Sequence, residues 1–310
     1  MRPLTHMREI VAAAKKNMPV RAAVVHPVSA AIMTSLAGAL QEGILDPVLV
    51  GPERKIRAAA AEAGLDISPY RLVDTPHSHA AAAAAMTLAR AGEVDAIMKG
   101  ALATGELMEA AMSKDAGIRT DRRMSHVFVM EVSRYPKLLL ITDAAINVEP
   151  DLTQKRDIAQ NAIDLGHALG IARPKVAILA AVEHVDQRFR STVDAAALCK
   201  MADRGQISGA VLDGPLAFDN AISREAATAK GIVSPVSGEV DILLAPDIEA
   251  GNMIAKQLTY LADAQTAGIV LGGRVPVILT SRSGNAYGRV VSIALASLLI
   301  RARGGKVHTA

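Results

Sequence analysis

Short apolar runs alternate with longer, helix-patterned segments along most of the chain. Residues 21–27, 47–51, 71–75 and 94–100 are runs dominated by valine, leucine, isoleucine and alanine, and segments with helical spacing separate them. Strands covered by helices on both faces read as continuous apolar runs, so this pattern predicts an α/β fold with a parallel sheet. The alanine-rich residues 79–90 have high helix propensity, and we interpret them as a packed helix and not as a linker.

The middle of the chain breaks this alternation. Residues 126–132 and 137–145 are both strand-like, and only four residues separate them. A parallel crossover needs a dozen residues or more, so we expect an antiparallel hairpin here. With the later runs the chain has roughly ten strands, more than one compact doubly wound sheet usually holds. We therefore expect two α/β domains, with residues 1–133 and a returning 283–310 in the first and residues 134–282 in the second.

A strand-to-helix junction near the end of the chain carries candidate chemistry. Residues 275–279 are strand-like and a helical pattern begins near residue 287, with Thr280, Ser281 and Arg282 between them. A helix N-terminus carries partial positive charge, and a guanidinium can hold two oxygens of one phosphate, so the junction predicts an anion site. The alternative is an ordinary helix cap beside a solvated arginine.

Other polar residues follow the predicted strands. Ligands of open α/β sheets collect at the carboxyl ends of the strands, where this chain places cations, hydroxyls and carboxylates. These candidates are Lys99, Thr104, Arg123, Ser125, His126, Asp143, Asn147, Asp247 and Asn252, in addition to the junction residues. The mixture suits a phosphorylated small molecule, although the aspartates also fit as helix caps and the arginine as part of a solvated loop.

Composition excludes several classes of function. The 34 basic and 31 acidic residues give a net charge of +3, and no basic arm points to nucleic acid. The longest apolar stretch, residues 290–300, is shorter than the roughly 20 residues that cross a bilayer. One cysteine, Cys199, allows no internal disulfide and lies in a helical pattern as a core residue. We expect a cytoplasmic protein without membrane contact.

The common nucleotide, metal and hydrolase motifs are absent. The sequence has no GxGxxG, GxxxxGK[ST], HExxH, paired CxxC or GxSxG. Their absence weakens a dehydrogenase, kinase, metalloenzyme or esterase interpretation, and we expect no metal site.

Six longer stretches carry a resemblance to a known family. In these stretches the chain resembles the phosphate acetyltransferase/phosphate butyryltransferase family, particularly its butyryltransferase-like branch. It also resembles the acyltransferase part of proteins in which such a domain is fused to an enoyl-CoA hydratase. The stretches are residues 98–108, 124–131, 141–163, 212–223, 246–258 and 268–283.

The resemblance implies reversible transfer of an acetyl to butyryl group between coenzyme A and inorganic phosphate, with coenzyme A as substrate and no cofactor. It also implies a homodimer of chains with two α/β domains around a cleft, as in isocitrate and isopropylmalate dehydrogenases. Ser281 and Arg282 match the family's Ser-Arg pair and would bind phosphate or the acyl phosphate. Arg123 with Ser125 matches a second anion-binding stretch, and Lys99 a third.

The chain departs from the family at the expected thiol base. Acetyltransferase members carry an aspartate near the position of Gly288 and Arg289, and many butyryltransferase-like members carry one at Gly284. His126 and Asp143 are our candidates for the base that activates the thiol for direct attack on the acyl phosphate. The alternatives are a non-catalytic protein that binds coenzyme A or acyl phosphate, and a metal- and NAD-dependent dehydrogenase of the related fold.

Overall fold

The computed structural model describes residues 2–279 and 286–304, which form an α/β fold of two compact units. The first, called the β1 unit, holds residues 8–124 and the chain from residue 267 onward. The second, called the β5 unit, holds residues 1–7 and 125–266. No described helix has the length and apolar character needed to span a membrane.

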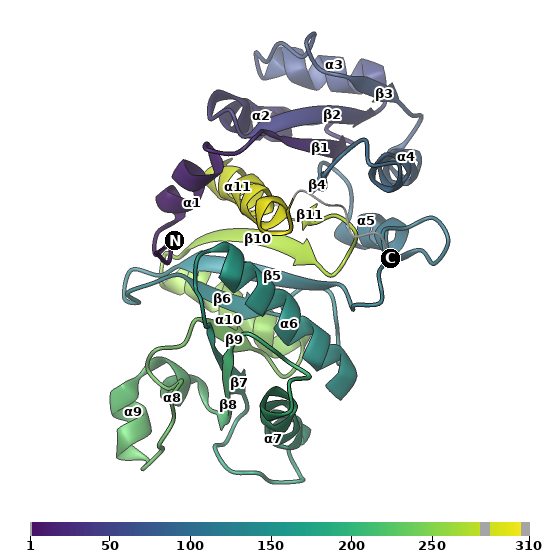
Figure 1. Ribbon diagram of the computed structural model, residues 1–310. Helices are drawn as coiled ribbons and strands as arrows, with labels where there is room; N and C mark the ends of the chain where they lie inside the picture. The colour runs from purple at the N-terminus through teal and green to yellow at the C-terminus, as the bar shows by residue number, and fades with distance from the viewer. Residues whose placement is uncertain (1, 280–285, 305–310) are drawn as a thin grey trace. The chain divides into compact units, whose positions relative to one another are not determined.

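The β1 unit contains a mixed sheet whose strands run in the order β3-β2-β1-β4-β11-β10 (Figure 1). Its strand pairs are parallel except β10 with β11, which are antiparallel because only five residues connect them. The strands are β1 (Val20–Val25), β2 (Leu45–Gly51), β3 (Leu72–Asp74), β4 (Ala96–Lys99), β10 (Gln265–Leu271) and β11 (Val277–Ile278).

Helices of the β1 unit pack in two groups on this sheet. Helix α2 packs on α3 and on α11, while α4 packs on α5 and on strands β1, β2 and β4. Every residue from 288 to 299 of α11 is buried, which agrees with its apolar residues on all faces. The helices are α1 (Met7–Ala14), α2 (Ala30–Gln41), α3 (Glu53–Glu62), α4 (Ser78–Arg90), α5 (Thr104–Met112) and α11 (Ala286–Ala302).

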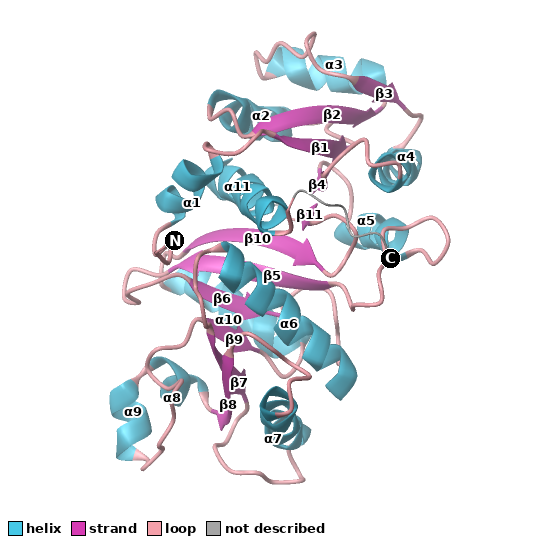
Figure 2. Cartoon of the chain, in the orientation of Figure 1, coloured by secondary structure: helices cyan, strands magenta, loops and turns pink. Residues whose placement is uncertain are grey.

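The β5 unit has its own strands, in the order β5-β6-β9-β7-β8 (Figure 2). Strands β5 and β6 are antiparallel, and the pairs β6–β9, β9–β7 and β7–β8 are parallel. The strands are β5 (Ser125–Glu131), β6 (Leu139–Thr142), β7 (Lys175–Leu179), β8 (Val211–Leu216) and β9 (Ile242–Leu244). The helices are α6 (Leu152–Ala168), α7 (Arg190–Asp203), α8 (Phe218–Ile222), α9 (Arg224–Ala229) and α10 (Ile248–Leu261).

The predicted α/β class, parallel pairing and hairpin are confirmed. Strands β5 and β6 form the expected hairpin, with Val127 opposite Thr142 and Met130 opposite Leu139. The alanine-rich segment is the packed helix α4. The predicted strand at residues 275–279 is shorter, with only Val277 and Ile278 in β11.

The two units divide the chain at 7/8, 124/125 and 266/267, whereas the sequence suggested 133/134 and 282/283. The boundaries differ from the predicted ones because hydrogen-bonded segments stay in the same unit. Strand β5 stays with β6, and β11 joins the β1 unit because it pairs with β4. The first residues join the β5 unit because the Leu4 backbone N–H donates to the Leu169 carbonyl at 3.0 Å and that of Met7 to Glu131 Oε2 at 2.8 Å.

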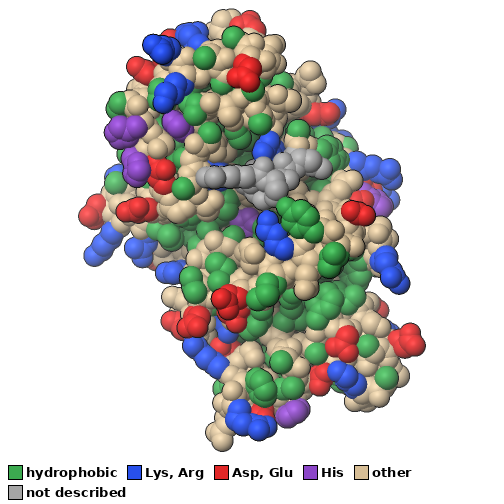
Figure 3. Space-filling view, turned by 180° about the vertical axis from the view of Figure 1, so that it is seen from behind, with side chains coloured by type: hydrophobic (Ala, Val, Ile, Leu, Met, Phe, Trp, Pro, Cys, Tyr) green, Lys and Arg blue, Asp and Glu red, His purple; other side chains and the backbone are tan. Residues whose placement is uncertain are grey.

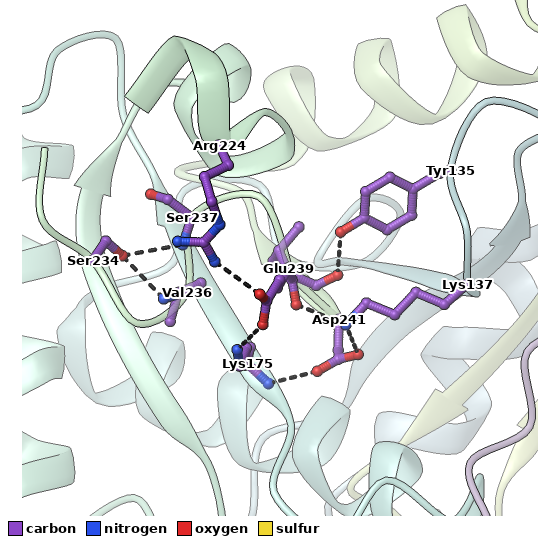
Figure 4. A network of polar contacts seen from close by, with 10 residues as sticks. Tyr135, Lys137, Lys175, Arg224, Ser234, Val236, Ser237, Glu239 and Asp241 are labelled. Carbon is purple, nitrogen blue, oxygen red and sulfur yellow. Dashed lines mark hydrogen bonds and ion pairs between the residues drawn. The ribbon is translucent and has the colours of Figure 1, made fainter. Parts of the chain in front are cut away.

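A polar network holds the amino ends of three strands in the β5 unit (Figure 4). Lys137 Nζ donates to Asp241 Oδ1 at 2.5 Å, and the Lys175 backbone N–H donates to Asp241 Oδ2 at 2.8 Å. Glu239 accepts from Lys175 Nζ and, at 2.9 Å, from Arg224 Nη2. Every charge named here has an opposite charge as partner, so the network stabilises strand register and offers no vacant charge to a ligand.

Candidate functional site

The carboxyl ends of β1, β4 and β11 lie next to one another in the β1 unit. Val25 at the end of β1 pairs with Lys99 at the end of β4, and Ile278 at the end of β11 pairs with Met98. The loops that follow therefore start from neighbouring points, which we call the carboxyl edge of the β1 unit. Thr280, Ser281 and Arg282 come directly after β11 and Leu279 in the sequence, but they lie outside the described residues.

Lys99 is a buried cation at this edge, with 6% of its surface exposed. Its Nζ donates to the carbonyl oxygens of Leu102 at 2.9 Å and Gly100 at 3.3 Å. The next residue must be glycine, because a Cβ at Gly100 would overlap the backbone of Val25 and His26. This close approach fixes the position of the ammonium group relative to the neighbouring strand.

The other predicted residues of the β1 unit are more exposed. Thr104 is half-buried at the first position of α5, whose N-cap residue Ala103 has no side-chain acceptor. Arg123 is exposed in the segment before β5.

Ser125 and His126 open strand β5 in the β5 unit and are almost fully buried. Ser125 Oγ accepts a hydrogen bond from Asn161 Nδ2 at 2.8 Å. The His126 ring meets the Phe128 ring edge-on at 4.4 Å between centroids, and the His126 carbonyl accepts from Thr142 Oγ1 at 2.9 Å. These contacts fix the start of β5 against β6 and α6.

Asp143 follows β6 and organises the loop after it. Its Oδ1 accepts from the backbone N–H groups of Ala145 at 2.9 Å and Ile146 at 3.1 Å. Its Oδ2 accepts from Asn147 twice, from the backbone N–H at 3.2 Å and from Nδ2 at 2.5 Å. The structure thus brings the predicted Asp143 and Asn147 together in one hydrogen-bonded turn.

Helix α10 packs its first turn against the same loop. Asp247 caps the helix by accepting a hydrogen bond from the Ala250 N–H at 2.8 Å. This agrees with the alternative interpretation of the aspartates as helix caps. Asn252 Nδ2 donates to the Ala144 carbonyl at 3.1 Å. A Cβ at Gly251 would overlap the Asp143 carbonyl oxygen, so glycine permits this approach. Four predicted residues of the β5 unit, Asp143, Asn147, Asp247 and Asn252, are therefore neighbours.

Sequence reasoning did not find two buried side chains that hold other polar groups in place. Asn161 lies on the buried face of α6 and bonds to Ser125, and Ser35 lies on the buried face of α2 and bonds to Arg289. The available signal was a polar residue at an apolar position of each helix, which identifies a buried hydrogen bond without naming its partner.

The remaining chemistry of the described residues is limited. No group of three or more histidine, cysteine, aspartate or glutamate side chains in the described part of the chain is placed to hold a metal ion. Burial raises the pKa of the Cys199 thiol to about 11, with Asp213 and Asp203 adding to the effect. A thiol with that pKa is protonated at neutral pH, and Cys199 is half-buried where the sequence predicted a core position.

Comparison with known proteins identifies relatives over most of the chain. The family model described as phosphate acetyl/butaryl transferase matches residues 75–297. A phosphate acetyltransferase of Rhizobium meliloti is 55% identical over 292 residues, which cover 93% of this chain and 92% of that protein. A phosphate butyryltransferase of Clostridium acetobutylicum is 41% identical over 291 residues, or 94% and 97% of the two chains.

Solved structures show the same fold. A branched-chain phosphotransacylase from Enterococcus faecalis V583 superposes with a TM-score of 0.79 at 27% identity, covering 91% of this chain and 99% of that one. A putative 4-hydroxythreonine-4-phosphate dehydrogenase from Salmonella typhimurium, at 15% identity and a TM-score of 0.58, covers 91% and 99% of the two chains. This second likeness confirms the dehydrogenase-like fold.

Proposed function

Because the chain belongs to the phosphate acetyltransferase/phosphate butyryltransferase family, we propose that it transfers a short acyl group reversibly between coenzyme A and inorganic phosphate. The observation that carries the proposal is the family match over residues 75–297, with relatives of both names above 40% identity. The chain is accordingly an acyltransferase. The dehydrogenase and non-catalytic alternatives have no such support.

The proposed chemistry is one displacement at the acyl carbon. The thiolate sulfur of coenzyme A adds to the acyl-phosphate carbonyl, and the new C–S bond gives a tetrahedral oxyanion. The oxyanion collapses as the bond between the acyl carbon and the bridging oxygen breaks, and inorganic phosphate leaves with that electron pair. An unperturbed thiol has a pKa near ~8.5 and is mostly protonated at pH 7, so a base or a cationic site must increase its thiolate fraction. Holding both substrates in position supplies much of the remaining acceleration, without a covalent enzyme intermediate.

In this proposal each polar or charged group has a separate role in the reaction. Ser281 and neighbouring backbone N–H groups stabilise the tetrahedral oxyanion, while Arg282 and Lys99 balance the charge of the departing phosphate. His126 and Asp143 are the proposed bases. The supporting observation for Lys99 is its fixed, buried position beside the end of β11. The further proposed substrate-binding residues are Thr104, Arg123, Ser125, Asn147, Asp247, Asn252 and Thr280.

An initial-rate assay tests this proposal. Acetyl-CoA or butyryl-CoA is mixed with phosphate, without added metal or nicotinamide, and the released thiol is titrated. We expect phosphate-dependent thiol release. The Arg282→Ala variant is expected to raise the phosphate KM roughly 10- to 100-fold, as for loss of a charge-assisted hydrogen bond. An unchanged KM would remove Arg282 from the phosphate site, and thiol release independent of phosphate would overturn the function.

The proposal includes a cytoplasmic homodimer that needs coenzyme A only as a substrate. Coenzyme A, acyl phosphate and phosphate are its proposed small-molecule partners. The apolar surface supports self-association, because Met253, Tyr260 and Leu261 of α10 are exposed and hydrophobic side chains gather on the β5 unit in Figure 3. Light scattering after size exclusion tests this: a mass near twice 32.4 kDa is expected, and a monomer would refute the dimer.

A further inference from the structure

Arg289 is a buried cation without a carboxylate partner in the described part of the chain. It lies in the first turn of α11 with 8% of its surface exposed. Its Nη1 donates to Ser35 Oγ at 2.6 Å and to the Ala31 carbonyl at 3.4 Å, both in α2. Its Nε is buried and has no hydrogen-bond partner among residues 2–279 and 286–304. Burying a guanidinium with so few partners is unfavourable, and desolvation lowers its pKa.

The surrounding helices add positive potential where this guanidinium lies. Basic residues are unfavourable in the first turn of a helix, because the helix N-terminus already carries partial positive charge. Arg289 contacts Ala31 and Ser35, the second and sixth residues of α2, and the N-cap residue Ser29 of this helix makes no side-chain capping hydrogen bond. The first turn of α2 contains no acidic residue, and neither does that of α11. The N-terminus of α2 and the Arg289 guanidinium thus contribute charge of the same sign to one region, an arrangement that would stabilise an anion.

This place belongs to the carboxyl edge of the β1 unit. Ser29 follows the end of β1 by only four residues, and β1 pairs in parallel with β4, which ends at Lys99. The contact from Arg289 to Ala31 brings the start of α11 to the same helix turn. Helix α2 has twelve residues, which is long enough for its N-terminus to bind an anion through backbone N–H groups.

We propose that the first turn of α2 and the Arg289 guanidinium form a binding site for a phosphoryl group of a substrate. The inference rests on the proposed function, which supplies two sources of that group: inorganic phosphate or acyl phosphate, and the phosphates of coenzyme A. Backbone N–H groups of α2 would donate to the phosphoryl oxygens, and Arg289 would supply the fixed positive charge. Arg289 is thus a binding residue that takes no part in bond making.

Charge-removing and charge-keeping variants of Arg289 test the site. We expect Arg289→Met to raise the KM of one phosphoryl substrate roughly 10- to 100-fold, as for loss of a charge-assisted hydrogen bond, with a smaller effect on kcat. Arg289→Lys should restore most of the affinity. The matched control is Arg301→Met at the other end of α11, where the side chain bonds to Asn17 Oδ1 at 2.7 Å, and it should leave both KM values unchanged.

The two KM values identify the source of the phosphoryl group. A rise in the phosphate KM alone assigns the site to inorganic or acyl phosphate. A rise in the coenzyme A KM alone assigns it to coenzyme A, and dephospho-CoA then tests the 3′-phosphate. If Arg289→Met changes neither KM, or if Arg289→Lys is as defective as Arg289→Met, the proposal is wrong.

A second variant decides the question even if Arg289→Met does not fold. Ser29→Asp supplies a stronger helix cap and a negative charge at the start of α2, and Ser29→Asn is its neutral counterpart. We expect Ser29→Asp to keep or raise the Tm of the free protein, yet to reduce the Tm increase caused by phosphate or coenzyme A relative to Ser29→Asn. Equal ligand-induced increases in both variants would overturn the proposal.

The Tm measurement requires no turnover, so it tests the phosphoryl site independently of the proposed acyl transfer. Wild-type protein that gains stability from phosphate or coenzyme A but releases no thiol retains the site and loses the proposed acyl transfer. Wild-type turnover with unaffected Arg289 and Ser29 variants retains the transfer and loses the site.

Discussion

Asp143 holds the loop after β6 and is at the same time a candidate for the base that deprotonates the thiol. Both of its oxygens already accept hydrogen bonds, four in all, from three consecutive backbone N–H groups and the Asn147 amide. A base must keep one lone pair in reach of the proton that it removes. These contacts favour a role in shaping the loop after β6, and the base remains a prediction divided between Asp143 and His126.

We predict that Asp143→Asn lowers the free energy of unfolding by about 2 kcal/mol, because an amide Nδ2 cannot accept from the N–H groups that the carboxylate serves. Urea denaturation followed by circular dichroism measures this difference. A variant that loses turnover while keeping wild-type stability would contradict the structural role and support the base.

At Cys199 the prediction concerns pH. Burial raises the pKa of this thiol from its ordinary value of 9.0 to about 11, so the reactive thiolate is scarce until the solution becomes strongly alkaline. At pH 8 its thiolate fraction should be about 100-fold lower than that of an unshifted thiol. Its reaction rate with a thiol reagent should still rise between pH 9 and 11. A rate that reaches a plateau below pH 9 would contradict the shift.

At the scale of elements, the approach of α10 to the β6 loop depends on one residue without a side chain. Gly251 faces the Asp143 carbonyl oxygen, whereas Gly105 of α5 has no heavy atom within 4 Å of the position that a Cβ would take. Both lie in helices, where alanine is the better helix former by up to about 1 kcal/mol.

Gly251→Ala should therefore destabilise the protein, whereas Gly105→Ala should not. Gly251→Ala is expected to lower the free energy of unfolding by about 1–3 kcal/mol, because α10 must move from the loop to accommodate the methyl group. Gly105→Ala should leave it unchanged or raise it. Paired urea denaturation curves measure both, and an equally stable Gly251→Ala protein would disprove the packing argument.

At the scale of the whole molecule, local pattern was sufficient for the elements. The apolar runs located most strands, and the short connection at residues 133–136 identified the β5–β6 hairpin. The antiparallel pairing of β10 with β11 was missed, although its five-residue connection obeys the same rule. The composition of these two segments predicts strands but does not give their relative direction.

The candidate site was only partly predictable from sequence. Lys99 was found because it stands at the end of a strand, which is a local property. The bond from Arg289 to Ser35 joins residues 254 positions apart, and no short pattern encodes it. The role of a buried polar residue depends on its hydrogen-bond partners, and those partners are known only from the structure.

The central claim is that inorganic phosphate is the acyl acceptor, and phosphorus NMR tests it most directly. Acyl-CoA and phosphate are incubated with the protein while the phosphate signal and the free thiol are followed together. We predict that an acyl-phosphate signal grows as the phosphate signal falls, with one thiol released for each phosphate converted. Thiol release with no phosphate consumed would show hydrolysis of the thioester and contradict the account.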